Sequence, residues 1–352
     1  MKAVCVSRFG GPEVLEVAEA PMPEPLRGEV RVRVHAAGVN PVDTYIRSGN
    51  YAAGLPELPY IPGTDGAGVV DCIGGGAPAE AGGQDGAAAM FNAHTPGYSY
   101  SYGVGDRVYV VGALSKRITG TYAEYAVCDA QSVFLLPPSL SYEQGAGLGT
   151  PGITACQALF RRARLTPGET VLIHGASGGV GSLAAQLAKM HGAVVFGTAG
   201  SARGLELLEG LGARRAFDHN KEGYDSQILE ATGGRGVDVI IEMLANANLE
   251  KDLGMIAPRG RIAIVGSRGS LDFNPRLAML KDAEILGVML RNMRQDELIA
   301  NTHILNAALD VGARVVVSSV YRLAEAPEAH ARVMEGGSCG KHIIKIVNVN
   351  NL

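Results

Sequence analysis

The chain has no surplus of basic residues, no long apolar run and no pattern of paired cysteines. Its 352 residues include 31 basic and 35 acidic side chains, and the net charge of −4 argues against nucleic acid as the main partner. No uninterrupted apolar run reaches the ~18 residues that a membrane-spanning helix needs, so we expect no membrane association.

Cysteine usage and the N-terminus indicate the compartment. The five cysteines are odd in number and none stands at C-x-x-C spacing, which argues against a disulfide framework and a zinc ribbon. The first ten residues contain no apolar core of the kind that a signal peptide has. We therefore expect a soluble, cytoplasmic protein.

Glycine is the residue in excess. The chain holds 48 glycines without the triplet period of collagen, and 47% of its residues are hydrophobic against 19% charged, which excludes general disorder. Its length exceeds what one hydrophobic core usually spans, so two domains are expected. This much glycine indicates tight turns and backbone that packs close to a ligand.

Strand-like segments dominate the first third of the sequence. Residues 29–34 alternate charged side chains with valine, which predicts a strand with one buried and one solvated face. Further strands are predicted at 68–72, 107–111 and 122–128. Helical patterning is scarce before about residue 142, so this part of the chain is expected to be β-rich.

A stretch of small residues interrupts these strands. Residues 74–90 are nearly all small, and the tyrosine-rich run 98–102 follows. This composition favours a mobile surface insertion at about 74–103. A lid or interface loop that uses the tyrosines is the alternative.

Strands and helices alternate from about residue 171. The buried strand 171–174 runs into a glycine turn, and a helical period follows at 182–190 before a second strand at 193–196. Repetition of this unit predicts a parallel sheet covered by helices on both faces, the doubly wound α/β or Rossmann fold. The later elements are expected as helices at 204–211, 225–232 and 248–256, strands at 215–217, 237–242, 261–265 and 284–290, and final strands at 314–320 and 342–347 that return to the first domain.

The glycine turn at 175–181 has the pattern of a dinucleotide-binding loop. Compared with G-x-G-x-x-G it reads Ala176, Gly178 and Gly181, so alanine replaces the first glycine. Its place between a strand and a helix predicts that the helix N-terminus binds a pyrophosphate. A glycine turn without a ligand is the alternative.

The end of the second strand predicts which nicotinamide cofactor is used. An NAD-dependent fold places an acidic residue there to bind the ribose 2′-hydroxyl, whereas residues 196–204 contain no acid before Glu206. Small residues and Arg203 leave room and positive charge for a 2′-phosphate, so NADPH is the expected cofactor. A solvated arginine at a helix start is the other interpretation of Arg203.

The sequence places no Cys, His and Glu cluster at metal-ligand spacing, so we expect no zinc catalysis. A polar run follows the first strand and is expected as a loop that offers amide, carboxylate, phenol and guanidinium groups for a substrate cleft. The alternative is a solvated surface loop without a functional role. The candidate catalytic residues are Asn40, Asp43, Tyr45, Arg47 and Tyr51.

Eight segments carry a resemblance to a known family. They are GVNPVDTYIRSG (38–49), PGTDGAG (62–68), GDRV (105–108), GTYAEYA (120–126), HGASGGVG (174–181), GTAGS (197–201), IIEMLANANL (240–249) and VGSRG (265–269). In this order they resemble the zeta-crystallin-like quinone oxidoreductases, in the zinc-free branch of the medium-chain dehydrogenase/reductase superfamily. The resemblance covers the chain except for the insertion near 74–103.

The resemblance implies a GroES-like catalytic domain over 1–135 and 300–352, and a Rossmann domain over 136–299. It implies reduction of quinones by NADPH in the cleft between them. Asn40 stands where zinc-dependent relatives have a ligand cysteine, and Gly63-Thr64-Asp65 replaces their Gly-His-Glu. Both replacements agree with the expected absence of a metal.

The resemblance also implies a set of cofactor contacts. These are Tyr45, Ser177, Gly178, Gly179, Val180, Gly200, His219, Asn248, Val265, Gly266, Ser267, Arg268, Val288, Met289 and Leu290. His219 is expected to meet the adenosine 2′-phosphate. Without the resemblance, His219 would be interpreted as a surface histidine.

A mechanism follows from the chemistry of quinones. They are electron-poor, so reduction needs no metal to polarise the carbonyl and depends mainly on positioning. Tyr45 is the expected hydrogen-bond donor to a quinone oxygen. Reduction of the C=C bond of enones or alkenals is one alternative function, and binding of AU-rich RNA or a structural role as a crystallin is another.

The expected assembly is a homodimer or homotetramer. In the family, edge strands such as 284–290 pair with their copy in a partner. The insertion near 74–103 has no counterpart in the family and leaves the assembly open.

Overall fold

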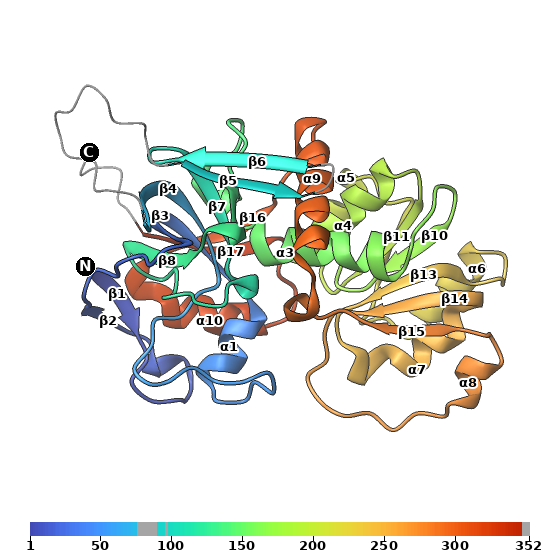
Figure 1. Cartoon of the computed structure of the whole chain (residues 1–352). Coiled ribbons are helices and arrows are strands. Elements are labelled where there is room, and N and C mark those ends of the chain that lie inside the picture. The colour runs from blue at the N-terminus through green and yellow to red at the C-terminus, as the bar shows by residue number, and fades with distance from the viewer. Residues whose placement is uncertain (76–89, 96–97, 347–352) are drawn as a thin grey trace.

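The computed structural model describes residues 1–75, 90–95 and 98–346, which form two lobes (Figure 1). A six-stranded parallel sheet with the order β12-β11-β10-β13-β14-β15 organises one lobe. Its central strands are runs of valine, leucine and isoleucine because both faces of the sheet are covered. The strands are β10 (Thr170–Ile173), β11 (Val194–Ala199), β12 (Arg215–Asp218), β13 (Val237–Glu242), β14 (Ile256–Ile264) and β15 (Glu284–Gly287).

Helices connect these strands and complete the doubly wound arrangement. They are α4 (Gly179–Met190), α5 (Ala202–Gly210), α6 (Tyr224–Ala231), α7 (Ala245–Met255) and α8 (Arg276–Met279). The strand order reverses between β10 and β13, and ligands of such folds bind at the carboxyl ends of the strands beside that point. The predicted Rossmann fold is confirmed.

A mixed seven-stranded sheet organises the other lobe, in the order β16-β17-β3-β4-β7-β9 with β8 paired to β3. The C-terminal strand joins it antiparallel to β3, with Ile343 opposite Gly38. The chain therefore returns to its first part after the parallel sheet, as expected. The strands are β3 (Glu29–Val39), β4 (Asp65–Ile73), β7 (Arg107–Val111), β8 (Tyr125–Asp129), β9 (Val133–Leu135), β16 (Val317–Arg322) and β17 (Lys341–Lys345).

Shorter elements cover this second sheet or link it to the first. The helices are α1 (Pro41–Arg47), α2 (Tyr142–Gly145), α3 (Gly149–Cys156), α9 (Gln295–Asp310) and α10 (Ala326–Met334), and a π-helical segment η4 (Gln157–Arg162) continues α3. The two-stranded sheet of β1 (Lys2–Cys5) and β2 (Glu16–Glu19) lies at the N-terminus. Single 3₁₀ turns occupy η1 (Pro12–Val14), η2 (Gly112–Leu114), η3 (Ala130–Ser132), η5 (Leu290–Asn292) and η6 (Leu323–Glu325).

One hydrophobic cluster extends through both lobes. It includes Tyr109 of the mixed sheet, Leu159 beyond α3 and Ile173 of the parallel sheet. Helix α3 approaches its neighbours closely because it carries glycine: a Cβ on Gly149 would lie 2.4 Å from the Val110 carbonyl oxygen. Helices α3 and α9 stand between the two sheets in Figure 1. The predicted domain boundaries therefore fall where the two lobes share a core, and they stay a prediction.

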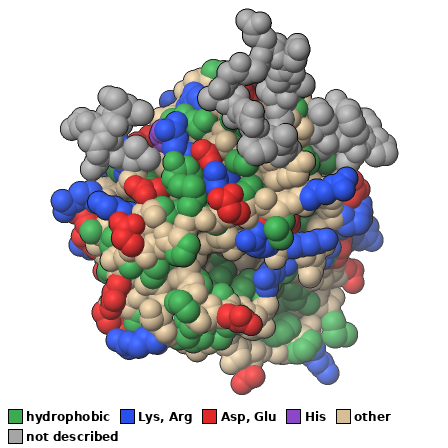
Figure 2. All heavy atoms as spheres, turned by 60° about the vertical axis from the view of Figure 1, so that its left-hand side comes forward, with side chains coloured by type: hydrophobic (Ala, Val, Ile, Leu, Met, Phe, Trp, Pro, Cys, Tyr) green, Lys and Arg blue, Asp and Glu red, His purple; other side chains and the backbone are tan. Residues whose placement is uncertain are grey.

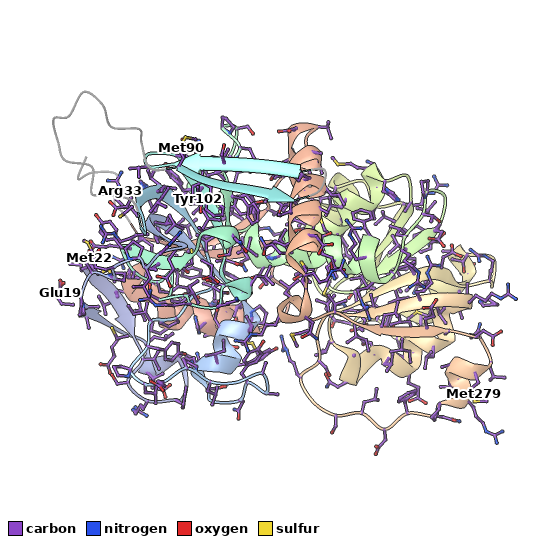
Figure 3. All side chains as sticks on the ribbon, viewed as in Figure 1. Glu19, Met22, Arg33, Met90, Tyr102 and Met279 are labelled. Atoms are coloured by element: carbon purple, nitrogen blue, oxygen red, sulfur yellow. The ribbon has the colours of Figure 1, made fainter. Side chains whose placement is uncertain are left out.

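Part of the expected insertion is ordered as a hairpin, which corrects the prediction of a surface loop for residues 98–102. Strand β5 (Met90–Thr95) pairs antiparallel with β6 (Tyr98–Gly103). The Tyr102 side chain is fully buried, and its hydroxyl donates to the Ala130 carbonyl oxygen at 2.7 Å (Figure 3). Residues 76–89 and 96–97 lie outside the described residues, so the prediction of mobility there stays untested.

Two further local predictions are corrected. The polar run expected as a loop forms α1, since Pro41 fits the first helical position and Asn40 and Asp43 form a capping box. The strand expected at 284–290 ends at Gly287, and residues 288–290 leave the sheet.

Candidate dinucleotide site and the polar cluster beside it

The glycine turn lies at the carboxyl end of β10 and leads directly into α4. Gly175 has a φ of +54°, which favours glycine, and Gly178 is the extended N-cap of α4. A Cβ on Gly181 would lie 2.5 Å from the Ala176 Cα, so only glycine lets the helix pack this close to the turn. The N–H groups of the first turn of α4 are left to bind a ligand, as the sequence pattern predicts.

The C-terminal segment packs on the same turn. Gly340 donates its N–H to the Ser177 carbonyl oxygen at 2.7 Å, and the Ser177 hydroxyl donates to the Ser338 carbonyl oxygen at 3.1 Å. The start of β17 is therefore fixed against the dinucleotide loop. No local pattern predicts this contact, because the two residues lie 161 positions apart.

The loop after β11 meets the end of β12. Ser201 caps α5, and its hydroxyl accepts the Gly204 N–H at 3.2 Å. A Cβ on Gly200 would lie 2.7 Å from Nε2 of His219, so the absence of a side chain leaves space in front of this nitrogen. Arg203 follows in the first turn of α5 and is exposed. Gly200 and His219, predicted from distant segments, thus lie together.

A second group of predicted contacts forms at the ends of β13 and β14. Glu242 Oε1 accepts hydrogen bonds from the Leu244 N–H and from Nδ2 of Asn248, the latter at 3.1 Å. The N–H of Val265 donates to the Glu242 carbonyl oxygen at 2.8 Å. The structure therefore brings Asn248 beside the segment 265–268.

The remaining predicted contacts extend along the same edge of the sheet. Asn246 Oδ1 accepts the Ser267 hydroxyl at 3.2 Å and the Arg268 N–H at 2.8 Å. Val288 donates its N–H to the Ile264 carbonyl oxygen at 2.9 Å, and Met289 after it is half exposed. These segments form one border around the carboxyl ends of the parallel strands.

A buried polar cluster lies in the other lobe, at the start of α1. Asn40 Nδ2 donates to Asp65 Oδ2 at 2.8 Å, and Asn40 Oδ1 accepts a hydrogen bond from the Lys341 ammonium. Lys341 lies 3.7 Å from Asp65, and both side chains are almost completely buried. The other carboxylate oxygen of Asp65 accepts the N–H and hydroxyl of Thr150, each within 2.8 Å.

Asp43 completes this cluster. Its carboxylate accepts the Asn40 N–H at 2.8 Å, and burial raises the pKa of Asp43 to about 7 even though the Lys341 ammonium acts in the opposite direction. Burial lowers the pKa of Lys341, and the two neighbouring carboxylates partly restore it. The cluster therefore holds a cation and two acidic groups away from water.

The other three candidate catalytic residues are placed differently. Tyr45 and Tyr51 are half-buried. Arg47 is buried, and its guanidinium contacts the Gly10 carbonyl oxygen at 3.2 Å and Nδ1 of His330 on α10 at 3.5 Å. The structure thus brings Asn40 and Asp43 together and places Arg47 in the packing between α1 and α10.

Lys341 and Thr150 were missed because nothing near them in the sequence marks them as functional. A third missed group lies beneath the dinucleotide loop, where His174, Glu242 and Asp252 come together. These three residues are far apart in the sequence and only the fold brings them together, so the expectation of no zinc catalysis stays a prediction. A hydrogen bond of 2.9 Å between His174 Nε2 and Asp252 Oδ1 accounts for this closeness.

Comparison with known proteins shows which protein families match this chain. Residues 26–138 match the model of the alcohol dehydrogenase GroES-like domain, and residues 179–307 match that of zinc-binding dehydrogenases. Together with the Rossmann sheet and the glycine turn, these matches define an oxidoreductase of the medium-chain dehydrogenase/reductase superfamily.

Relatives that match over nearly their whole length identify the family within this superfamily. The chain is 42% identical to a quinone oxidoreductase of Rattus norvegicus over 347 residues, which cover 98% of this chain and 97% of the relative. It is 31% identical to a quinone oxidoreductase of Pseudomonas aeruginosa, over 97% of this chain and 99% of the relative. The chain belongs to the quinone oxidoreductase family of that superfamily.

Solved structures agree with this fold. A quinone oxidoreductase of Pseudomonas syringae has a TM-score of 0.80 at 30% identity, covering 98% of this chain and 99% of that one. A mycobacterial protein complexed with NADPH has a TM-score of 0.83 at 28% identity, covering 98% of this chain and all of that one. Among the described residues, no helix is long and apolar enough to cross a membrane.

Proposed function

We propose that this chain reduces quinones with NADPH and without a catalytic metal. The observation that carries the choice of cofactor is the setting of His219. Its Nε2 faces the space left by Gly200, beside the first turn of α5, and the end of β11 has no acidic residue. An anionic 2′-phosphate fits this position better than a ribose hydroxyl.

The rest of the cofactor has a matching set of residues. The turn Ser177–Val180 at the start of α4 would hold the pyrophosphate, and Arg203 would add charge near the 2′-phosphate. Asn248, the segment 265–268 and the segment 288–290 would border the nicotinamide half, with Tyr45 opposite. NADPH supplies a hydride when it is bound.

On the acceptor side, the chain has to position the quinone and balance its charge. Tyr45 is our candidate donor to a quinone oxygen, and Tyr51 our candidate lining residue. Asn40 and Asp43 are oriented by hydrogen bonds within the buried cluster. Because quinones are electron-poor, such positioning suffices without Lewis acid catalysis.

The residues at the start of α1 do not fit a zinc ion. The cluster offers amide and carboxylate oxygens, with no thiolate or imidazole, and the Lys341 ammonium donates to Asn40 Oδ1. A buried ammonium at this place would repel a divalent cation. We therefore derive no step through a metal.

Activity with a panel of acceptors tests the proposal. We expect oxidation of NADPH with ortho- or para-quinones, a clear preference over NADH, and no stoichiometric zinc in the purified protein. Faster turnover of alkenals than of quinones would favour C=C reduction. Equal rates with NADH and NADPH, or stoichiometric zinc, would overturn the cofactor and metal parts of the proposal.

Binding of AU-rich RNA or a structural crystallin role would be a different class of function. Basic and acidic side chains are interspersed over much of the face in Figure 2, and no observation favours RNA. A salt-titrated gel shift with and without NADPH tests for RNA binding.

We further propose that the protein is cytoplasmic and forms a homodimer or homotetramer. Its proposed catalytic domain comprises residues 1–135 and 300–352, and its proposed Rossmann domain comprises residues 136–299. All five cysteines are free, which suits a reducing compartment. Strand β15 is a sheet edge, and Met279 and Leu280 on the adjoining α8 segment are 73% and 79% exposed (Figure 3). Light scattering tests the assembly.

A further inference from the structure

We infer that a buried chain of hydrogen bonds, from Asp252 through His174 and Thr198, fixes the protonation of His219 so that binding of NADPH takes up a proton. His174 and Thr198 would then be positioning residues for the choice between NADPH and NADH. The inference rests on the proposed contact between His219 and the 2′-phosphate, and it goes beyond that contact.

The hydrogen-bonded chain crosses three neighbouring strands beneath the dinucleotide loop. Asp252 on α7 lies 2.9 Å from Nε2 of His174, which follows β10. Nδ1 of His174 lies 3.3 Å from the Thr198 hydroxyl on β11, and that hydroxyl lies 3.4 Å from Nδ1 of His219 after β12. Asp252, His174 and Thr198 are all at least 97% shielded from solvent, whereas His219 is exposed.

The hydroxyl of Thr198 determines the direction of these bonds. It accepts the Gly175 N–H at 3.2 Å, so it has one proton and one lone pair left for the two histidines. If it donates to His174, then His219 must donate to it. If it donates to His219, then His174 must donate from Nδ1.

Asp252 decides between these two directions. As a carboxylate it accepts a proton from Nε2 of His174, and burial lowers the pKa of His174, which keeps the ring neutral and leaves Nδ1 as an acceptor. Thr198 must therefore donate to His174 and accept from Nδ1 of His219. Neutral His219 then presents a bare lone pair on Nε2 to the space in front of Gly200.

Glu242 allows Asp252 to be ionised. Burial raises the pKa of both carboxyl groups to about 7, but the contact between them raises the pKa of Glu242 and lowers that of Asp252, so Asp252 is the first of the two to lose its proton. Glu242 therefore holds the proton of the pair. Its Oε1 still accepts the hydrogen bonds from Leu244 and Asn248.

A bare Nε2 cannot donate a hydrogen bond to a phosphate. When a 2′-phosphate dianion enters, His219 must take one proton from solvent to become a donor at both nitrogens. Burial and His174 lower the pKa of His219 in the free protein, and Asp218 opposes them. Arg203 stands in the first turn of α5, and it would act on the phosphate rather than on the proton.

The sign of the pH dependence follows. Because the phosphate raises a His219 pKa that is low in the free protein, affinity for NADPH is highest below that low pKa and decreases as the pH rises from it to the raised pKa of the complex. Affinity for NADH, which lacks the phosphate, should not change over the same range.

Calorimetry of adenosine 2′,5′-bisphosphate and of 5′-AMP tests the inference. Titrations at about pH 8 in two buffers of different ionisation enthalpy count the protons taken up, and the phosphate is already a dianion there. For the wild-type protein we expect uptake approaching about one proton with the bisphosphate and none with 5′-AMP.

Thr198→Val removes the hydroxyl without changing the shape of the side chain. We expect the proton uptake to fall by more than half and the bisphosphate to bind roughly threefold to tenfold more weakly, with 5′-AMP unchanged. Thr198→Ser should restore both quantities. Thr302→Val is the matched control, since the buried Thr302 hydroxyl on α9 has no partner, and it should change neither quantity.

The outcomes separate the two proposals. If the wild-type protein does not prefer the bisphosphate over 5′-AMP, the proposed use of NADPH fails. If it has the preference and loses it in His219→Ala, but Thr198→Val keeps full proton uptake, then the inference about the buried chain is wrong and the use of NADPH stands. A thermal melt of each variant excludes misfolding as the cause, and Thr198→Ser decides the question if Thr198→Val does not fold.

Discussion

Replacement of Lys341 by methionine should destabilise the protein more than the same replacement of Lys345, the other lysine on β17. The ammonium is 95% shielded and faces the fully buried carboxylate of Asp65 at 3.7 Å. Loss of one partner of a buried ion pair typically costs about 3–5 kcal/mol, because the other charge stays buried. Asp65 keeps its bonds from Asn40 and Thr150, so we expect the lower end, about 3 kcal/mol.

The same strand provides a matched control. Lys345 lies 3.7 Å from Glu143, the same separation, but these side chains are 35% and 28% exposed. A partly solvated pair of this kind contributes about 0–1 kcal/mol, so Lys345→Met should cost less than about 1 kcal/mol. Urea unfolding at neutral pH, followed by circular dichroism, measures both variants.

A double mutant tests the cause. Asp65→Asn removes the charge that Lys341→Met leaves unpaired, so the double variant should lose clearly less stability than the sum of the two single losses. Equal losses for Lys341→Met and Lys345→Met, or strict additivity in the cycle, would refute the argument that a buried pair holds this cluster together.

Three other predictions concern the turn, the packing of α10 and the acceptor side. Gly181→Ala places a Cβ 2.5 Å from the Ala176 Cα, so we expect a loss of about 1–3 kcal/mol and weaker binding of NADPH, seen in melts and fluorescence titrations; unchanged binding would contradict the packing argument. Burial lowers the pKa of His330 to about 3, so the unfolded chain binds the proton more readily and the free energy of unfolding should increase with pH from about 3 to about 6.5. His330→Gln should flatten that part of the stability profile, and a variant with the wild-type slope would contradict this prediction. Tyr45→Phe should lower kcat with quinones and leave the KM for NADPH within about twofold, since one hydrogen bond is lost on the acceptor side only; unchanged turnover would remove the proposed role.

The local patterns of the sequence were sufficient for the parallel sheet. Strand 237–242 and the glycine turn were predictable because short-range periodicity and turn chemistry determine them. Helix α1 is different: Asn40, Pro41 and Asp43 carry a capping signal, but the polar composition of the run favours a loop. The alternation in YSYSY was likewise a strand signal that composition concealed.

The contacts among the polar groups beneath the site could not be predicted from the sequence. Lys341 meets Asn40 across 301 positions, and His174 meets Asp252 across 78. Such pairs depend on how two sheets and their helices pack, which no local pattern contains. Only the resemblance identified His219, and nothing in the sequence linked it to Thr198.

The hydrophobic cluster that extends from Tyr109 to Ile173 through α3 should make the two lobes unfold together. Two lobes with separate cores would melt in separate steps, whereas a shared core makes each lobe depend on the other for buried contacts. The calorimetric and van't Hoff enthalpies of unfolding should therefore agree for the monomeric chain, and neither half should fold well when expressed alone.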